Sequence, residues 1–262
     1  MCGKSCILLC NFYEIAVMKN VIICSILLLV GASAFAQSAE SAATGQPIER
    51  MVSVPKTDLL SAFSKIEIDG PMNVTLKRVA TGVDVKIVYD TKGCTTSRFK
   101  ATVNKEGVLR VEERIDQKRE TTTDVTVYYN TLTDITILRA TACFDDAVEC
   151  RILNLAVGGG AIVKLAVQSL DVALDCTGRS AVEISGSSRY FRLDASSSKV
   201  DARNLATVAS IVDASHNAEV RINVSERLEA STSTSAKLLY NGKPTIVREH
   251  TSLFGGDIIA LD

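Results

Sequence analysis

Leu170-Asp-Val-Ala-Leu-Asp-Cys-Thr177 is the first of three copies of one degenerate motif, which returns as Phe191-Arg-Leu-Asp-Ala-Ser196 and Ser210-Ile-Val-Asp-Ala-Ser215. The aspartates of the three copies are spaced 19 residues apart, at Asp175, Asp194 and Asp213. Related segments lie before and after them, at 153–160 and 227–231. A fixed period of ~20 residues indicates a stack of supersecondary units, each too small to bury a core alone.

A second column of apolar residues follows the same period. Its members are Val163, Val182, Val200, Val220 and Leu238, spaced 19, 18, 20 and 18 residues apart. Each precedes a residue predicted to point outward, namely Lys164, Glu183, Asp201, Arg221 and Leu239. Two short strands and a small-residue corner per repeat suit one coil of a parallel β-helix, in which equivalent residues stack about 4.8 Å apart. From Ile135 onward the period predicts roughly seven coils. A twisted antiparallel meander is the alternative.

The first half of the domain alternates apolar and polar residues with a period of two. The alternating segments are Phe63–Ile68, Met72–Leu76, Val83–Tyr89, Phe99–Val103, Val108–Val111 and Val125–Tyr129. Such segments, bounded by Gly, Asp and Asn, are half-buried strands, and Gly107 marks a hairpin turn. We therefore expect an all-β protein: a parallel (right-handed) β-helix-like stack of ~19-residue coils preceded by an alternating-strand β region, in a single elongated domain.

The N-terminal residues predict export. Residues 1–17 precede a better start at Met18 and resemble an over-extended reading frame. Residues 18–36 combine a basic start, a short apolar run and an Ala-x-Ala site, which describes a signal peptide cleaved before Gln37. We expect a flexible leader at 37–58, the β-helical domain at 59–262, and a location in the periplasm, on the outer-membrane surface or outside the cell. The membrane would then be a partner only transiently, through the signal peptide.

Charge and cysteine content restrict the partners. The formal net charge of −1 argues against nucleic acid or an anionic membrane surface. Cys94, Cys143, Cys150 and Cys176 follow the signal peptide, and export permits their oxidation. Cys143 and Cys150 could close a small loop, whereas Cys176 shares the repeat position of Gly159, Ala195 and Ala214 and suits a buried thiol. No zinc-ligand spacing occurs and there are two histidines, so no metal or other cofactor is expected.

Several segments resemble the putative auto-transporter adhesin, head GIN domain family of exported bacterial proteins. They are Phe63-Ser-Lys-Ile-Glu-Ile-Asp-Gly70-Pro-Met-Asn-Val-Thr-Leu76, Gly107-Val-Leu-Arg-Val111, Leu132-Thr-Asp-Ile-Thr-Ile137, Leu239-Tyr-Asn-Gly-Lys-Pro244 and Gly255-Gly-Asp-Ile258. The resemblance covers roughly residues 62–260 and implies a β-helical fold and a cell-envelope location. The chain departs from the family's Ser-Gly-Ser-Gly-like corners at 143–146, 196–198 and 231–235.

The aspartate column is the sharpest candidate for chemistry. Asp175, Asp194 and Asp213 should stack on one outer face, with Glu229 near the next rung. Such a ladder could bind Ca²⁺ through oxygen ligands or supply acid and base for glycoside cleavage, but the pattern favours solvated corner carboxylates over both.

Other polar clusters have plainer explanations. Asp145, Asp146 and Glu149 form an exposed acidic turn, and Gly158–Gly160 lacks the Lys-Ser/Thr of a phosphate loop. Ser215 and His216 are adjacent in sequence, which is poor geometry for a nucleophile and its base.

These patterns favour a non-catalytic, exported binding or adhesion module of the cell envelope or surface. Its ligand, a glycan or a protein, is not encoded in any motif. The alternative is a carbohydrate-active enzyme of the lyase or hydrolase type that uses the outward aspartate column, with or without calcium.

Overall fold

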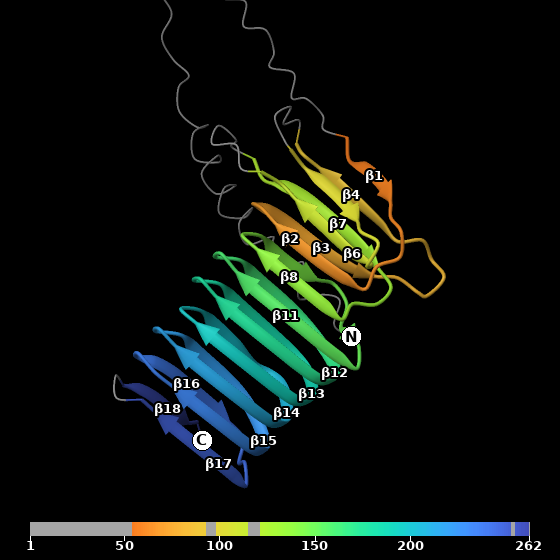
Figure 1. Cartoon of the computed structure of the whole chain (residues 1–262). Helices are drawn as coiled ribbons and strands as arrows, with labels where there is room; N and C mark the ends of the chain where they lie inside the picture. Colours follow the sequence, from red (N-terminus) through yellow and green to blue (C-terminus); the bar gives the residue numbers. More distant parts are fainter. Residues whose placement is uncertain (1–53, 93–97, 115–120, 253–254, 262) are drawn as a thin grey trace, which may run out of the picture. The chain divides into compact units, whose positions relative to one another are not determined.

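The computed structural model describes residues 54–92, 98–114, 121–252 and 255–261, and in these ranges every regular element is a strand (Figure 1). The strands are β1 (Lys56–Leu59), β2 (Lys65–Asp69), β3 (Met72–Arg78), β4 (Lys86–Asp90), β5 (Lys100–Val103), β6 (Val108–Glu112), β7 (Thr123–Tyr129), β8 (Asp134–Leu138), β9 (Thr141–Phe144), β10 (Val148–Glu149), β11 (Ile152–Gly158), β12 (Ile162–Thr177), β13 (Ala181–Ser196), β14 (Lys199–Ser215), β15 (Glu219–Thr232), β16 (Ala236–Asn241), β17 (Ile246–Thr251) and β18 (Gly256–Ala260). The predicted extension 1–17, the signal peptide 18–36 and leader residues 37–53 lie outside the described ranges.

Successive coils pair in parallel from β8 onward. The first half of each long strand, β12 to β15, continues one sheet, and after a bend its second half continues another (Figure 1). β8, β11 and the second halves of β12 to β15 stack in order and end with β17. This arrangement confirms the predicted β-helix-like stack and excludes the antiparallel meander.

The aliphatic ladder supplies the core of the stack. Val163, Val182, Val200, Val220 and Leu238 pair rung by rung, and each is at most 2% exposed. The residue after each points outward, so the predicted alternation of inner and outer positions is confirmed in this column. Equivalent aliphatic side chains on successive coils bury one another, which a single coil could not achieve.

The tight corners between strands use left-handed backbone rather than small side chains alone. Gly178 and Arg179 have φ of 66° and 65°, and Ser197 and His216 both have φ of 54°. A Cβ added at Gly178 would lie 3.2 Å from the backbone nitrogen of Gly159 in the coil below, so that corner is also closely packed. Non-glycine residues are tolerated in this conformation at a cost, and the stacked corner backbones fix them there.

The bend within each long strand is fixed by close backbone approach and by buried hydroxyls. Gly186 has a φ of 109°, and an added Cβ there would lie 2.0 Å from the carbonyl oxygen of Val167. Ser188 and Thr207 are buried at the bend and donate hydrogen bonds to backbone carbonyl oxygens. These hydroxyls therefore have hydrogen-bond partners although they are buried, and they tie neighbouring coils together at the bend.

The N-terminal strands belong to the same sheet system, but their spatial order differs from their chain order. β2 lies between β6 and β8, and β3 lies between β7 and β9, all in parallel pairings. β1, β4 and β5 add antiparallel strands to this end. The expected β5–β6 hairpin is confirmed, with Gly107 at a φ of 70° in its turn.

The described cysteines are thiols. Cys143 and Cys150 form no disulfide with each other, so the small-loop closure does not occur, and Cys176 is fully buried. Cys176 lies level with Ala195 and Ala214 as expected, but its neighbour on the preceding coil is Val157, not Gly159. Cys94 lies outside the described residues. No helix in the described ranges is long and apolar enough to cross a membrane.

Candidate binding face

Outward side chains of β8, β11, the second halves of β12 to β15, and β17 form one surface, here called the aspartate face. Its central column carries Ala156, Asp175, Asp194, Asp213, Ser231 and His250 on successive rungs. The three predicted aspartates therefore stack on one exposed face, as the repeat indicates.

Glu229 does not extend this column. It lies level with Ile211, two residues before Ser231, because the β14–β15 register shifts between Ala202 and Ala206 and again between Thr207 and Ala209. Arg227 and Arg248 both form ion pairs with Glu229, and these pairs lower the pKa of its carboxyl.

The aspartate column is not neutralised by neighbouring cations. Within the described part of the chain, Asp175, Asp194 and Asp213 make no ion pair, and no group of three or more His, Cys, Asp or Glu residues is arranged to hold a metal ion.

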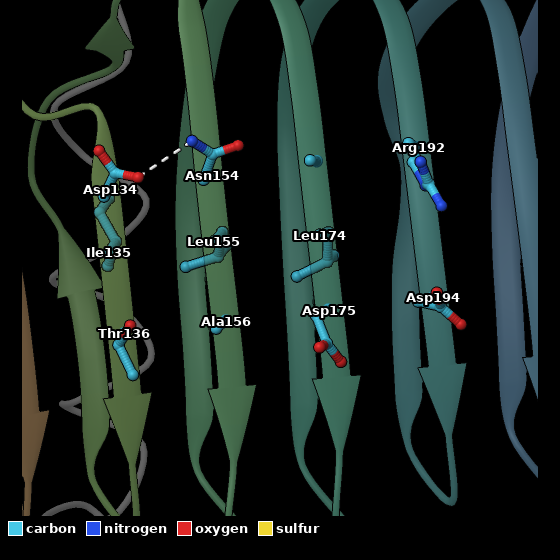
Figure 2. Close-up of a pocket in the computed structure, with 11 residues that line it drawn as sticks. Asp134, Ile135, Thr136, Asn154, Leu155, Ala156, Leu174, Asp175, Arg192 and Asp194 are labelled. Carbon is cyan, nitrogen blue, oxygen red and sulfur yellow. Dashed lines mark hydrogen bonds between the residues drawn. The ribbon is translucent and has the colours of Figure 1, made fainter.

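A first hollow opens where two alanines take outward positions. Ala156 and Ala173 leave a space of about 250 Å³ above Leu155 and Leu174 (Figure 2). Its polar rim consists of Asp134, Thr136, Asn154, Asp175, Arg192 and Asp194.

Asp134 is the most firmly held of these rim groups. Partial burial disfavours its charge, but Thr133 Oγ1 donates to it at 2.8 Å and Asn154 Nδ2 at 3.0 Å, and Lys65 lies 3.5 Å away. Together these partners lower the pKa of Asp134, so its carboxylate is a fixed, charged hydrogen-bond acceptor.

A second hollow of about 390 Å³ is more apolar. Ile152, Tyr190 and Ile211, all close to half exposed, line it above the buried Phe191. It shares Ala173 and Arg192 with the first hollow. Sequence reasoning missed Tyr190; the available signal was an aromatic at an outward repeat position in a chain with only 5% aromatic residues.

A third hollow of about 310 Å³ shares Ile211 with the second. Its other outward residues are Asp213, Glu229, Ser231, Arg248 and His250. Shared lining residues therefore join three hollows into one series along the stack.

The surface formed by the first halves of the long strands, here called the ion-paired face, differs in its electrostatics. Its charges neutralise one another across coils: Lys164 Nζ lies 2.9 Å from Glu183 Oε1, and Lys199 Nζ lies 3.5 Å from Glu219 Oε2. A shallow hollow of about 320 Å³ lies among these paired side chains. A ligand there would compete with existing ion pairs, which disfavours this face as a charged binding surface.

The remaining predicted clusters have structural roles. Asp145 pairs with Lys77 at 2.9 Å, and Glu149 pairs with Arg78 at 2.7 Å, so two of the three carboxylates of the acidic turn are neutralised by β3. His216 Nδ1 lies 3.0 Å from Ser215 Oγ and 3.3 Å from Ser196 Oγ at an exposed corner. Among the described residues its ring meets hydroxyls and no carboxylate, so no nucleophile–base–orienting triad forms.

The protein is a β-solenoid, and one face of its coils carries exposed aspartates and three adjoining hollows. A profile of the putative auto-transporter adhesin, head GIN domain family matches residues 62–244, and the chain belongs to that family. The membership confirms the resemblance seen in the sequence and supports a surface-type binding role. No curated protein matches the sequence.

Solved structures share the fold at low sequence identity. A putative adhesin from Bacteroides fragilis is 16% identical with a TM-score of 0.70, covering 80% of this chain and 97% of its own. A putative adhesin from Parabacteroides distasonis is 14% identical with a TM-score of 0.60, covering 80% and 97%. A putative lipid binding protein from the same species is 14% identical with a TM-score of 0.58, covering 79% and 97%. At these identities the likeness establishes the architecture.

Proposed function

We propose that this protein is an exported, non-catalytic binding module of the cell envelope or surface, and that it binds through the aspartate face. One observation carries the proposal: this face presents three connected hollows and uncompensated aspartates, whereas the ion-paired face neutralises its charges internally. Open hollows with a few polar groups around an apolar floor are typical of ligand sites.

Export is supported by the sequence from Met18 to Ala36, which has the composition of a signal peptide. Intact mass of the envelope fraction tests this part of the proposal, with a mature N-terminus at Gln37 as the expected result. A product that retains Met1 in the cytoplasm would contradict it.

The arrangement of the carboxylates favours binding over hydrolysis. Glycoside hydrolases place an acid and a second carboxylate on either side of the scissile bond. Asp175, Asp194 and Asp213 instead project from one side of a sheet, in one column. Turnover of any polysaccharide that disappears in Asp194→Asn would favour the enzyme over the binding module.

The binding test compares the two faces with one kind of substitution. The purified protein is screened on arrays of glycans and envelope proteins, with and without Ca²⁺. Ala173→Arg fills two hollows of the aspartate face, whereas Ala181→Arg places the same side chain on the ion-paired face. We expect the first variant to lose binding and the second to keep it. The reverse pattern would show that the binding face is misassigned, and loss on chelation would assign calcium to the aspartate column.

A further inference from the structure

The second hollow has the chemistry of a sugar site. We propose that it is a saccharide-binding subsite in which a pyranose ring lies against Tyr190, next to Ala209 on the following coil and diagonal to Ala173 on the preceding coil. The proposal rests on the binding role assigned to the aspartate face and names the ligand class for that face.

Tyr190 forms the platform. Its side chain is 45% exposed on the rigid strand β13, next to the buried Phe191. The guanidinium carbon of Arg189 lies over the ring, 5.5 Å from its centroid, which restrains the ring. Ile152 and Ile211 extend the apolar surface beside it. A flat apolar ring with a wet hydroxyl edge matches the C–H face and hydroxyl rim of a sugar.

Two outward alanines give the platform its depth. Ala209 lies level with Tyr190 on the next coil. On the preceding coil Asp171 lies level with Tyr190, and Ala173 lies two residues further along, level with Arg192. Each alanine leaves a space that a longer outward side chain would occupy. The resulting volume of about 390 Å³ lies within the ~300–1,000 Å³ range of small-molecule sites.

The polar rim selects a ligand that both donates and accepts hydrogen bonds. Asp171 only accepts and Arg192 only donates, and neither side chain has an ion-pair or hydrogen-bond partner in the described ranges. Sugar hydroxyls satisfy both groups at once. An acyl chain would desolvate both without replacing their hydrogen bonds, and a peptide of one charge would be attracted by one group and repelled by the other.

The adjoining hollows extend the site along the stack. The first hollow shares Ala173 and Arg192 with the subsite, and the third shares Ile211. Rungs repeat about every 4.8 Å, which is close to the length of one pyranose unit, so neighbouring sugar units of a linear chain would lie over successive coils. Affinity should therefore rise from disaccharide to hexasaccharide.

The test uses the purified protein and three hexasaccharide probes, built from neutral hexose, N-acetylhexosamine and alternating uronic acid units. Binding is measured by calorimetry and by saturation-transfer NMR, with thermal unfolding of each variant as the folding control. We expect at least one probe to bind. Tyr190→Ala should weaken that binding about tenfold, which is the loss of one anchoring aromatic. Ala209→Arg should abolish it by filling the hollow, while Ala181→Arg, on the ion-paired face, should leave it within about twofold.

Two outcomes would overturn the proposal: no binding of any probe, or folded Tyr190→Ala and Ala209→Arg variants that bind like the parent protein. If no saccharide binds, but an envelope protein binds and Ala173→Arg abolishes that binding, the aspartate face is correctly assigned as the binding face and the saccharide subsite is refuted. If a saccharide binds and only Ala181→Arg abolishes it, both assignments fail.

Discussion

Val182→Asp probes the core of the stack at one rung. Val182 is 2% exposed and lies between Val163 and Val200, so an introduced carboxylate has aliphatic neighbours above and below. Keeping that carboxyl protonated at neutral pH costs about 4 kcal/mol, since its pKa in the unfolded chain is about 4 and each pKa unit is worth ~1.4 kcal/mol. Lost burial of the valine adds about 1.5 kcal/mol, for a total of about 5.5 kcal/mol.

Glu183→Lys is the matched control, one residue away on the outer side. It breaks the Lys164–Glu183 pair, whose side chains are about half exposed, so its cost should stay below about 1 kcal/mol. Urea unfolding followed by far-UV circular dichroism measures both variants. The loss of unfolding free energy caused by Val182→Asp should become smaller toward pH ~4, because the carboxyl is then protonated in the unfolded chain as well. Equal deficits for the two variants, or a Val182→Asp deficit that does not change with pH, would refute the assigned register.

Three further changes test particular contacts. Gly186→Ala should lower the midpoint of thermal unfolding strongly, because its Cβ would lie 2.0 Å from the Val167 carbonyl oxygen. The control is Gly82→Ala, at a φ of 93° with no atom within 4 Å of the added Cβ, which should cost only about 1–2 kcal/mol of backbone strain. Equal midpoints for the two variants would contradict this reasoning. Tyr129→Phe should be neutral or stabilising at neutral pH, because the buried phenol oxygen has no hydrogen-bond partner among the described residues. Burial raises the pKa of Tyr129 to about 12, so the free energy of unfolding of the parent protein should fall as the pH rises from about 10. Urea unfolding at several pH values should show a smaller fall for Tyr129→Phe. Asp134→Asn should weaken the acid-induced loss of stability. The lowered pKa of Asp134 means that its carboxylate stabilises the fold at pH values above its pKa in the unfolded chain, and this stabilisation is lost as the pH falls through its pKa in the folded protein. An unchanged dependence of stability on pH in the acid range would contradict this.

The sequence predicts which side chains face the core better than it predicts which rung they occupy. Val182 and Glu183 show the first kind of success: alternation with a period of two assigns one inward and the next outward. Both errors of placement are slips of two residues. Cys176 neighbours Val157 and not Gly159, and the rung after Asp213 holds Ser231. A two-residue slip preserves the inner and outer pattern, so hydrophobicity alone cannot detect it.

The candidate site depends on which residues lie level with one another on adjacent coils, and it was therefore harder to predict. Asp175, Asp194 and Asp213 share one spacing and were found, but the second hollow arises where Ala209 lies level with Tyr190 and Ala173 lies diagonal to it on the preceding coil. Their juxtaposition depends on register, which shifts between Glu183 and Ser185 where β13 pairs with β14. An outward alanine is common in strands, and it indicates a hollow only when its neighbours above and below are known.

The placement of β2 and β3 between later strands has a kinetic consequence. Lys65 pairs with Val108 on one side and Asp134 on the other, so its strand stays bare at one edge until a segment ~70 residues downstream has been synthesised. Coils after β8 meet the preceding neighbour as soon as they emerge, and their assembly can propagate locally. Pulse-labelled hydrogen exchange should show amides of β2 protected later than those of β13, and the opposite order would refute this sequence of events. Because synthesis runs from the N-terminus, the segment made first is then the one that stays longest with an open strand edge, exposed to chaperones and to pairing with other chains.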